Sequence, residues 1–234
     1  MIIKMENITI KEAMEQRHSV RRYLDKVIDE KLVAILQNKI NELNIEGKLH
    51  IQLVLDEPKA FHGINSYGAF HGVKNYIVMI GKKSKDLDRK VGYYGEQIVL
   101  LAQMLGLNTC WVGLTYSKIK GICQLEKDEK IACVIAIGYG VTQGLPHKIK
   151  TIEQVSNISA STPCWFRSGV EAALLAPTAM HQQKFYFEYI AVADGKDLVR
   201  AKSGFSLFGY TQMDLGIAQY HFEIGAGHDN FMWE

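Results

Sequence analysis

The stretch "DLDRKVGYYGEQIVLLAQMLG" (86–106) decides how the chain folds. Its apolar residues recur with a period near 3.6, at Val91, Tyr94, Ile98, Leu101, Ala102 and Leu105. This spacing predicts one long helix, and Gly106 is the residue that ends it. Because most of the stretch is apolar, we expect this helix to be central and well buried.

Strand-like runs lie on both sides of that helix. "LHIQLVL" (49–55) and "NYIVMIG" (75–81) precede it, and "NTCWVG" (108–113) and "IACVIAIG" (131–138) follow it. The last run is continuously apolar and of strand length, which is typical of an interior strand. Cys110 and Cys133 fall inside these runs and read as small buried residues.

Helix signals open the chain. Thr9 and Glu12 fit a capping box, which predicts a short helix through about Arg17. A second helix is expected after Asp29, with apolar residues at helical spacing (Leu32, Ile35, Leu36, Ile40 and Leu43). Gly47 is its predicted end.

The later part repeats the succession of helix, strand and helix. Thr162 as N-cap and Pro163 in the first turn predict a helix to about Ala176, which Pro177 stops. A strand over 184–193 and a helix over 211–225 follow. The fold class is therefore α+β, a mostly antiparallel or mixed sheet flanked by helices. We expect one domain over 1–234, in which 1–150 and 151–234 form weakly similar repeats.

Composition excludes several classes of function. The 234 residues carry a net charge of only +2, which gives no general case for a nucleic-acid partner. No apolar run approaches 18 residues, so no membrane span is expected. The four cysteines form no C-x-x-C pair, and no metal site is expected. With no leader-like apolar stretch at the start, we expect a cytoplasmic protein.

The first candidate site is "RHSVRRY" (17–23). Arg17 and Arg21 are four residues apart, which places both on one face if the turn is helical. Together with His18 and Ser19 they suit a phosphate, whose oxygens arginine binds in pairs. The alternative is that these cations only complement a helix C-terminus.

The second candidate is "LLAPTAMHQQKFYF" (174–187), which joins a helix-like run to a strand-like run. Read alone, Pro177 is a helix stop and the two glutamines form a polar turn. Phe185 and Phe187 are expected in the core, on one face of the strand.

Four segments together resemble the FMN-dependent nitroreductase family: "RHSVRRYLDKVI", "LLAQMLGLNTCWVG", "IAIGYG" and "LLAPTAMHQQKFYF". In typical members the segment with Ala-Pro-Ser follows the first helix directly, whereas here it comes last. Typical members are homodimers in which one subunit supplies the Arg-Ser-Arg group and the other supplies the Ala-Pro-Ser group. The chain resembles a smaller branch in which two such halves are fused into a pseudo-dimer, which implies one FMN per chain.

The resemblance implies a set of cofactor-binding residues. Arg17, His18, Ser19 and Arg21 would hold the ribityl phosphate and the pyrimidine edge, with Lys148 and Lys150 reaching the phosphate. The turn of Trp111, Val112 and Gly113 would present a backbone N–H to flavin N5. The residues implied to lie across the isoalloxazine are Pro177, Thr178, Met180, His181 and Gln183. Thr178 replaces the usual serine and keeps its hydroxyl, whereas His181 replaces an asparagine.

Family members also place residues of a middle loop over the flavin or substrate. Tyr67, Phe70 and His71 lie in the corresponding Gly-rich loop here, where an ordinary surface loop is an equal alternative.

The implied activity is hydride transfer from NADH or NADPH, through FMN, to an electron-poor acceptor such as a nitroaromatic or quinone. FMN carries the redox chemistry, so no catalytic residue is predicted. The fused chain is expected to be a monomer or a weak homodimer. The alternative is a flavin-binding or partner-binding protein without NAD(P)H-driven turnover.

Overall fold

The computed structural model describes residues 8–61, 70–192, 195–207 and 209–234. The chain divides into two compact units, which are described separately. Unit 1 comprises 1–87 and 98–146, and unit 2 comprises 88–97 and 147–234. Helix α3 (Leu87–Met104) is the predicted long helix, and its residues 88–97 belong to unit 2.

Unit 1 is built on an antiparallel sheet of order β1-β2-β4-β3. Its strands are β1 (Gln52–Val54), β2 (Asn75–Lys82), β3 (Asn108–Val112) and β4 (Glu129–Gly138). β4 lies between β2 and β3, which confirms the interior strand predicted from its apolar run. Cys110 and Cys133 are buried in β3 and β4, as predicted.

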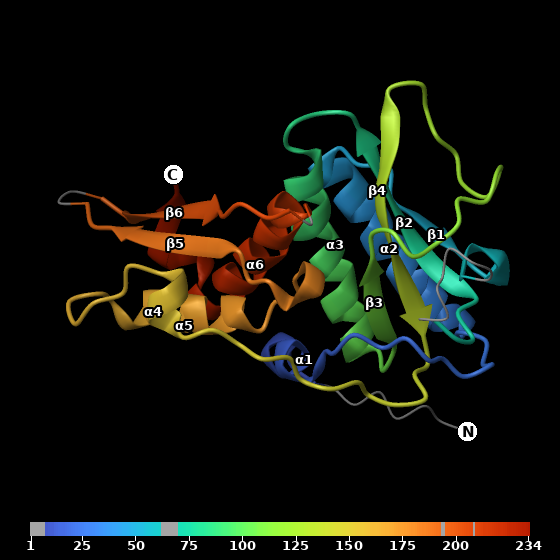
Figure 1. The fold of residues 1–234 in the computed structure, drawn as a ribbon, viewed down its shortest axis with the longest axis horizontal. Helices are drawn as coiled ribbons and strands as arrows, with labels where there is room; N and C mark the ends of the chain where they lie inside the picture. The colour runs from blue at the N-terminus through green and yellow to red at the C-terminus, as the bar shows by residue number, and fades with distance from the viewer. Residues whose placement is uncertain (1–7, 62–69, 193–194, 208) are drawn as a thin grey trace. The chain divides into compact units, whose positions relative to one another are not determined.

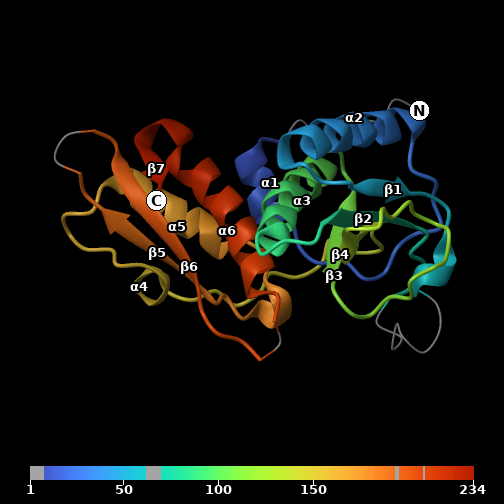
Figure 2. The same cartoon turned by 90° about the horizontal axis from the view of Figure 1, so that it is seen from above.

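Two further helices belong to unit 1. α1 (Ile10–Gln16) begins with the predicted Thr9–Glu12 capping box. α2 (Glu30–Gly47) begins at Asp29, whose side chain accepts from the Lys31 amide, and runs along one face of the sheet (Figures 1 and 2). The left-handed residue that ends α2 is Lys48 and not the predicted Gly47, which is still helical.

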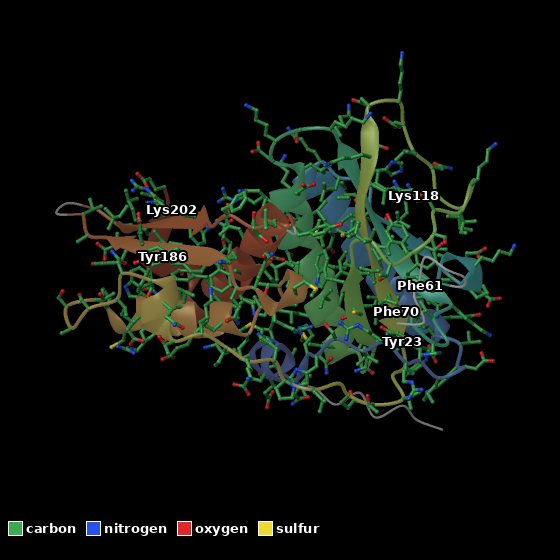
Figure 3. All side chains as sticks on the ribbon, viewed as in Figure 1. Tyr23, Phe61, Phe70, Lys118, Tyr186 and Lys202 are labelled. Atoms are coloured by element: carbon green, nitrogen blue, oxygen red, sulfur yellow. The ribbon has the colours of Figure 1, made fainter. Side chains whose placement is uncertain are left out.

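The 3-10 helix η1 (Pro58–Phe61) contributes to a core cluster between the sheet and its loops. Figure 3 labels Tyr23, Phe61 and Phe70 of this cluster, in which the rings of Phe61 and Phe70 meet edge to face at 5.2 Å. Phe70 is therefore a core residue, and the exposed His71 follows it. Tyr67 lies outside the described residues.

Unit 2 contains a smaller sheet of order β5-β6-β7, with strands β5 (Phe185–Ile190), β6 (Asp197–Ser203) and β7 (Phe231–Trp233). β5 and β6 are antiparallel, and β6 and β7 are parallel. Tyr186 and Lys202, labelled in Figure 3, face each other across β5 and β6. The two sheets thus give the predicted α+β fold with antiparallel and mixed pairing.

Helices α5 (Cys164–Leu174) and α6 (Thr211–Ala226) pack together against this sheet (Figure 2). Phe187 of β5 stacks on Phe222 of α6 with ring centroids 4.7 Å apart, and Phe185 is also buried, as predicted. The shorter elements of the unit are α4 (Ile152–Val155), η3 (Ala179–His181) and η4 (His228–Asn230). Pro163 is itself the N-cap of α5, so the prediction of Thr162 at that position was wrong.

Within the described ranges, no helix is both long enough and apolar enough to cross a membrane.

Candidate functional site

In unit 1, three backbone neighbours hold the segment that carries the predicted cations. The Val20 N–H donates to the Thr109 carbonyl of β3 at 3.0 Å. The Tyr23 N–H donates to the His71 carbonyl at 2.9 Å, and the Leu24 N–H donates to the Tyr139 carbonyl at 2.8 Å. The chain between α1 and α2 is thus fixed in place by segments distant in sequence.

The segment is extended and not helical, which corrects the basis of one prediction. α1 ends at Gln16, Arg17 has φ −70° and ψ 114°, and Ser19 forms a parallel bridge with Thr109. In extended backbone, alternate residues share a face. Arg17, Ser19 and Arg21 therefore lie on one side because of a period of 2, and not because of the four-residue spacing of a helix.

These three side chains all influence the Cys110 thiol of β3. Burial raises the pKa of this thiol, while Arg21, a hydrogen bond from the Ser19 side chain and Arg17 lower its pKa. Arg17 is only 3% exposed, Ser19 is half-buried and Arg21 is exposed. The set therefore combines a buried guanidinium, a hydroxyl and an accessible guanidinium, a donor set that matches an anionic phosphate.

His18 lies on the other side of the segment, against the loop at 139–144. Burial and the neighbouring Arg17 lower the pKa of His18, so its imidazole is mostly neutral at pH 7. Gly144 has a left-handed φ of +79°, and an added Cβ would lie 2.7 Å from the Cβ of His18. A glycine is thus required for the loop to approach this closely.

The predicted turn of Trp111, Val112 and Gly113 lies at the end of β3. Val112 is buried and is the last residue of the strand, and Gly113 is half-buried just beyond it. Thr109, which is bridged to Ser19, lies on the same strand. Strand β3 therefore carries this turn and also binds the segment with Arg17, Ser19 and Arg21, which we call the cation set. The contact of the Gly113 amide with a flavin remains a prediction.

An open hollow of about 750 Å³ lies elsewhere in unit 1. It is bordered by Glu15, His18, Lys26, Tyr139 and Gln143, among others, and the Lys26 ammonium lies 3.7 Å from the centre of the Tyr139 ring. Among the described residues of its wall, His18 alone belongs to the predicted site. The volume of the hollow is in the range of small-molecule sites. The hollow is nevertheless separate from the candidate phosphate site formed by Arg17, Ser19 and Arg21.

In unit 2, the segment that follows α5 has an uncommon backbone. Pro177 and Thr178 are buried, while Met180 and His181 are exposed. Met180, His181 and Gln183 have φ values of 53°, 52° and 43°, in the left-handed region that non-glycine residues seldom adopt. Such residues persist only where the surrounding structure holds them.

Gln183 is the centre of a buried hydrogen-bond network. It is 1% exposed, and its amide oxygen accepts from the Lys150 backbone N–H at 2.8 Å. Its amide nitrogen donates to the Leu174 carbonyl at 3.2 Å and contacts the Nε2 of His147 at 3.2 Å. The Lys150 ammonium donates to the Gln183 carbonyl at 2.7 Å. The structure thus brings Lys150 and Gln183 together.

The remaining predicted residues of unit 2 lie around this network. The His181 ring stacks on the His147 ring, with centroids 5.2 Å apart and planes 13° apart. Burial and Lys184 lower the pKa of Lys150, whereas Lys148 is simply exposed. The structure therefore integrates Lys150 into the segment and leaves Lys148 on the surface.

Two residues at these sites were missed from sequence. Cys110 was predicted to be buried, but not as a neighbour of Ser19 and the two arginines. Asp214 of α6 is 3% exposed and bonds to the 178–183 segment. The available signal was an acidic residue amid the apolar residues of "QMDLGIA" (212–218).

A sequence model of the family described as "Putative TM nitroreductase" matches residues 9–226 of the chain. No curated protein sequence matches it.

Solved structures share the fold. One, described as a "putative nitroreductase" from Thermotoga maritima, is 24% identical with a TM-score of 0.67, covering 94% of this chain and 84% of that one. Another, from Desulfovibrio desulfuricans, is described as a "putative nitroreductase in complex with fmn" and is 17% identical. Its TM-score is 0.52, and the alignment covers 67% of this chain and 99% of that one. A nitroreductase family protein from Streptococcus pneumoniae is 12% identical with a TM-score of 0.50, covering 63% and 98% of the two chains.

Proposed function

Because the chain belongs to the nitroreductase family whose model matches residues 9–226, we propose that it is an FMN-dependent oxidoreductase. NADH or NADPH is the proposed electron donor, and a nitroaromatic, a quinone or a similar electron-poor compound is the proposed acceptor. When bound, FMN would supply the hydride chemistry.

The observation that carries the proposal is the placement of Arg17, Ser19 and Arg21 on an extended segment that is bonded to β3 at Thr109, next to Cys110. Two guanidinium groups beside a hydroxyl can neutralise a phosphate and pair with its oxygens. The half-buried Gly113 follows on the same strand and has no side chain to keep a planar ring at a distance.

The second part of the proposal concerns unit 2. Following the resemblance, we assign Pro177, Thr178, Met180, His181 and Gln183 to the flavin ring system, with Lys148 and Lys150 assigned to the phosphate. The backbone strain at Met180, His181 and Gln183 supports a functional role for this segment, since such strain gathers at ligand sites. A fused pseudo-dimer, a monomer or weak homodimer, and a cytoplasmic setting complete the proposal.

The test begins with the purified chain, soaked with FMN and freed of excess flavin. We expect the absorbance of oxidised flavin to remain with the protein and to bleach when NADPH or NADH is added without oxygen. Return of the absorbance on adding a quinone would complete the cycle.

Two outcomes count against the proposal. Loss of all flavin on desalting would overturn it. Retained flavin that neither nicotinamide bleaches would favour a flavin-binding protein without turnover.

A further inference from the structure

The backbone conformation of the segment from Thr178 to Gln183 depends on contacts from outside the segment. The segment contains three of the six left-handed non-glycine residues of the described chain: Met180, His181 and Gln183. Each carries a conformational cost relative to ordinary backbone. A free loop of this sequence would relax, so contacts from outside the segment must maintain its shape.

Some of the stabilising contacts are the hydrogen bonds of Gln183 with Lys150 and Leu174. Another involves Thr178. The Thr178 hydroxyl accepts from the Gln183 backbone N–H at 3.1 Å, which closes the segment on itself. These bonds fix its two ends. In the middle, the His181 N–H donates to the Thr178 carbonyl at 3.0 Å and the Gln182 N–H donates to the Ala179 carbonyl at 3.1 Å. These turn bonds leave the Ala179 N–H and the Gln182 side chain to contacts from outside the segment.

Asp214 of α6 supplies two of these outside contacts, beside a longer bond from the Gln182 Nε2 to the Gly209 carbonyl at 3.3 Å. Its Oδ1 accepts from the Ala179 backbone N–H at 2.9 Å, and its Oδ2 accepts from the Nε2 of Gln182 at 2.8 Å. The carboxylate thus bridges backbone and side chain on both sides of the left-handed pair Met180–His181. Because Asp214 is only 3% exposed, water competes little for these bonds.

The helix that carries Asp214 is itself firmly held. Gly216 lies two residues further along α6, and an added Cβ there would overlap the Arg89 carbonyl oxygen of α3. Arg89 in turn donates from Nε to the Gln219 side chain at 2.6 Å. The carboxylate therefore has a fixed position from which to orient the segment.

We propose that Asp214 is a positioning residue that holds Thr178–Gln183 in the shape that receives FMN, a role that rests on the function proposed above. Asp214 lies outside every segment that carries the family resemblance. It acts on the cofactor through the segment it holds, and it is not assigned a contact with the flavin.

Other charged groups near α6 are engaged elsewhere. Glu96 of α3 contacts His221 at 2.9 Å, and Glu223 accepts from Tyr93. On α5, the charge of Arg167 helps to lower the pKa of Glu153. On β6, Arg200 and Lys202 pair with Glu188. Burial raises the pKa of Asp214 to about 6, although the hydrogen bonds from Ala179 and Gln182 act in the opposite direction.

The test separates the loop from the cofactor. In the full chain without flavin, the rate of hydrogen exchange at the Ala179 amide measures how well the bond to Asp214 protects that amide. The dissociation constant for FMN, measured in each variant, shows whether this bond affects cofactor binding. The variants are D214A, which removes both acceptors, and D214N, which keeps an oxygen for Ala179. The matched control is D229A, an exposed aspartate of the same unit.

We expect D214A to speed Ala179 exchange at least tenfold and to weaken FMN binding about tenfold, with D229A unchanged. Compared with D214A, D214N should restore part of the protection of the Ala179 amide. D214N also serves as the test variant if D214A does not fold. Unchanged Ala179 exchange in folded D214A would overturn the positioning role. If D214A does not fold, unchanged exchange together with unchanged FMN affinity in D214N would overturn it. Faster exchange with unchanged FMN affinity would overturn its connection to the cofactor. If the unaltered chain binds no FMN, the proposed function fails as well, whereas the exchange measurement still decides whether Asp214 holds the loop.

Discussion

At the scale of residues, burial of the Asp214 carboxylate makes the free energy of unfolding depend on pH. Burial raises its pKa from 3.8 to about 6. At about 1.36 kcal/mol per pKa unit, this rise corresponds to ~3 kcal/mol between the two protonation states. The folded chain binds this proton more tightly than the unfolded chain. The contribution of the proton to the free energy of unfolding is therefore fully present below the pKa of the unfolded chain. It is lost as the pH rises through about 6.

We therefore predict that D214N removes one component of the pH dependence of stability. The free energy of unfolding of the unaltered chain minus that of D214N should fall by ~2–3 kcal/mol from about pH 4 to about pH 7. Urea denaturation at several pH values measures this difference, and taking the difference cancels the other carboxylates. Two parallel curves would mean that Asp214 has an ordinary pKa in the folded chain.

Arg21 and Arg22 offer a matched pair on one extended segment. Both are exposed, but only Arg21 alternates with Ser19 along the extended segment and influences the Cys110 thiol. If Arg21 binds the phosphate, R21A loses a charge-assisted contact of about 1.5–3 kcal/mol, so the Kd for FMN should rise roughly 10- to 100-fold. R22A should change it little. Equal losses in the two variants would indicate only general charge attraction.

The residue types of this site could be predicted from sequence, but their geometry could not. Two arginines and a serine within five residues suggested a phosphate. Their common face, however, depends on the bridge from Ser19 to Thr109, ninety residues away in sequence. The Asp214 contact to Ala179 is equally nonlocal, and no pattern within "QMDLGIA" identifies the partner of a buried acid.

At the scale of elements, two glycines set the approach of helices within unit 2. An added Cβ on Gly92 of α3 would overlap the Met213 carbonyl oxygen, and one on Gly216 of α6 would overlap that of Arg89. The backbones of α6 and residues 88–97 of α3 are therefore in direct contact. A larger residue at either glycine would force the helices apart.

We predict that G216A destabilises the chain despite the helix propensity of alanine, which favours it by about 1 kcal/mol. The overlap with backbone should cost more than this, leaving a net loss of ~2 kcal/mol or more and a Tm lower by roughly 5 °C. The control is G204A, where the nearest atoms would lie 3.6–3.7 Å away. A G216A variant as stable as G204A would show that this helix contact is loose.

Most of the elements could be predicted because their patterns are local. The period of 3.6 predicted α2, α3 and α6, and the apolar runs predicted β2 and β4. The strands β6 and β7 were missed. β6 reads "DLVRAKS", whose charged residues pair with neighbouring strands, as in the contact of Lys202 with Glu188 at 2.6 Å. Such a strand is identified by its partners and not by its own composition.

At the scale of the whole molecule, the order of the family signatures is the main sequence evidence for a fused chain. Unit 1 carries the cation set and the turn after β3, and unit 2 carries the segment from Pro177 to Gln183. The units are unequal, with four strands in one sheet and three in the other. Sequence similarity between two such divergent parts is too weak to establish a repeat, so the pseudo-dimer remains a prediction.

The proposed fused arrangement predicts one FMN per chain, because the resemblance implies that the two groups of a flavin site each occur once in this sequence. Titrating the purified chain with FMN, while following flavin fluorescence and protein concentration, measures this ratio directly. The account predicts saturable binding that ends at one FMN per 234-residue chain. Two equivalent sites per chain, or no saturation up to about 100 µM FMN, which corresponds to binding weaker than about −5.5 kcal/mol, would contradict it.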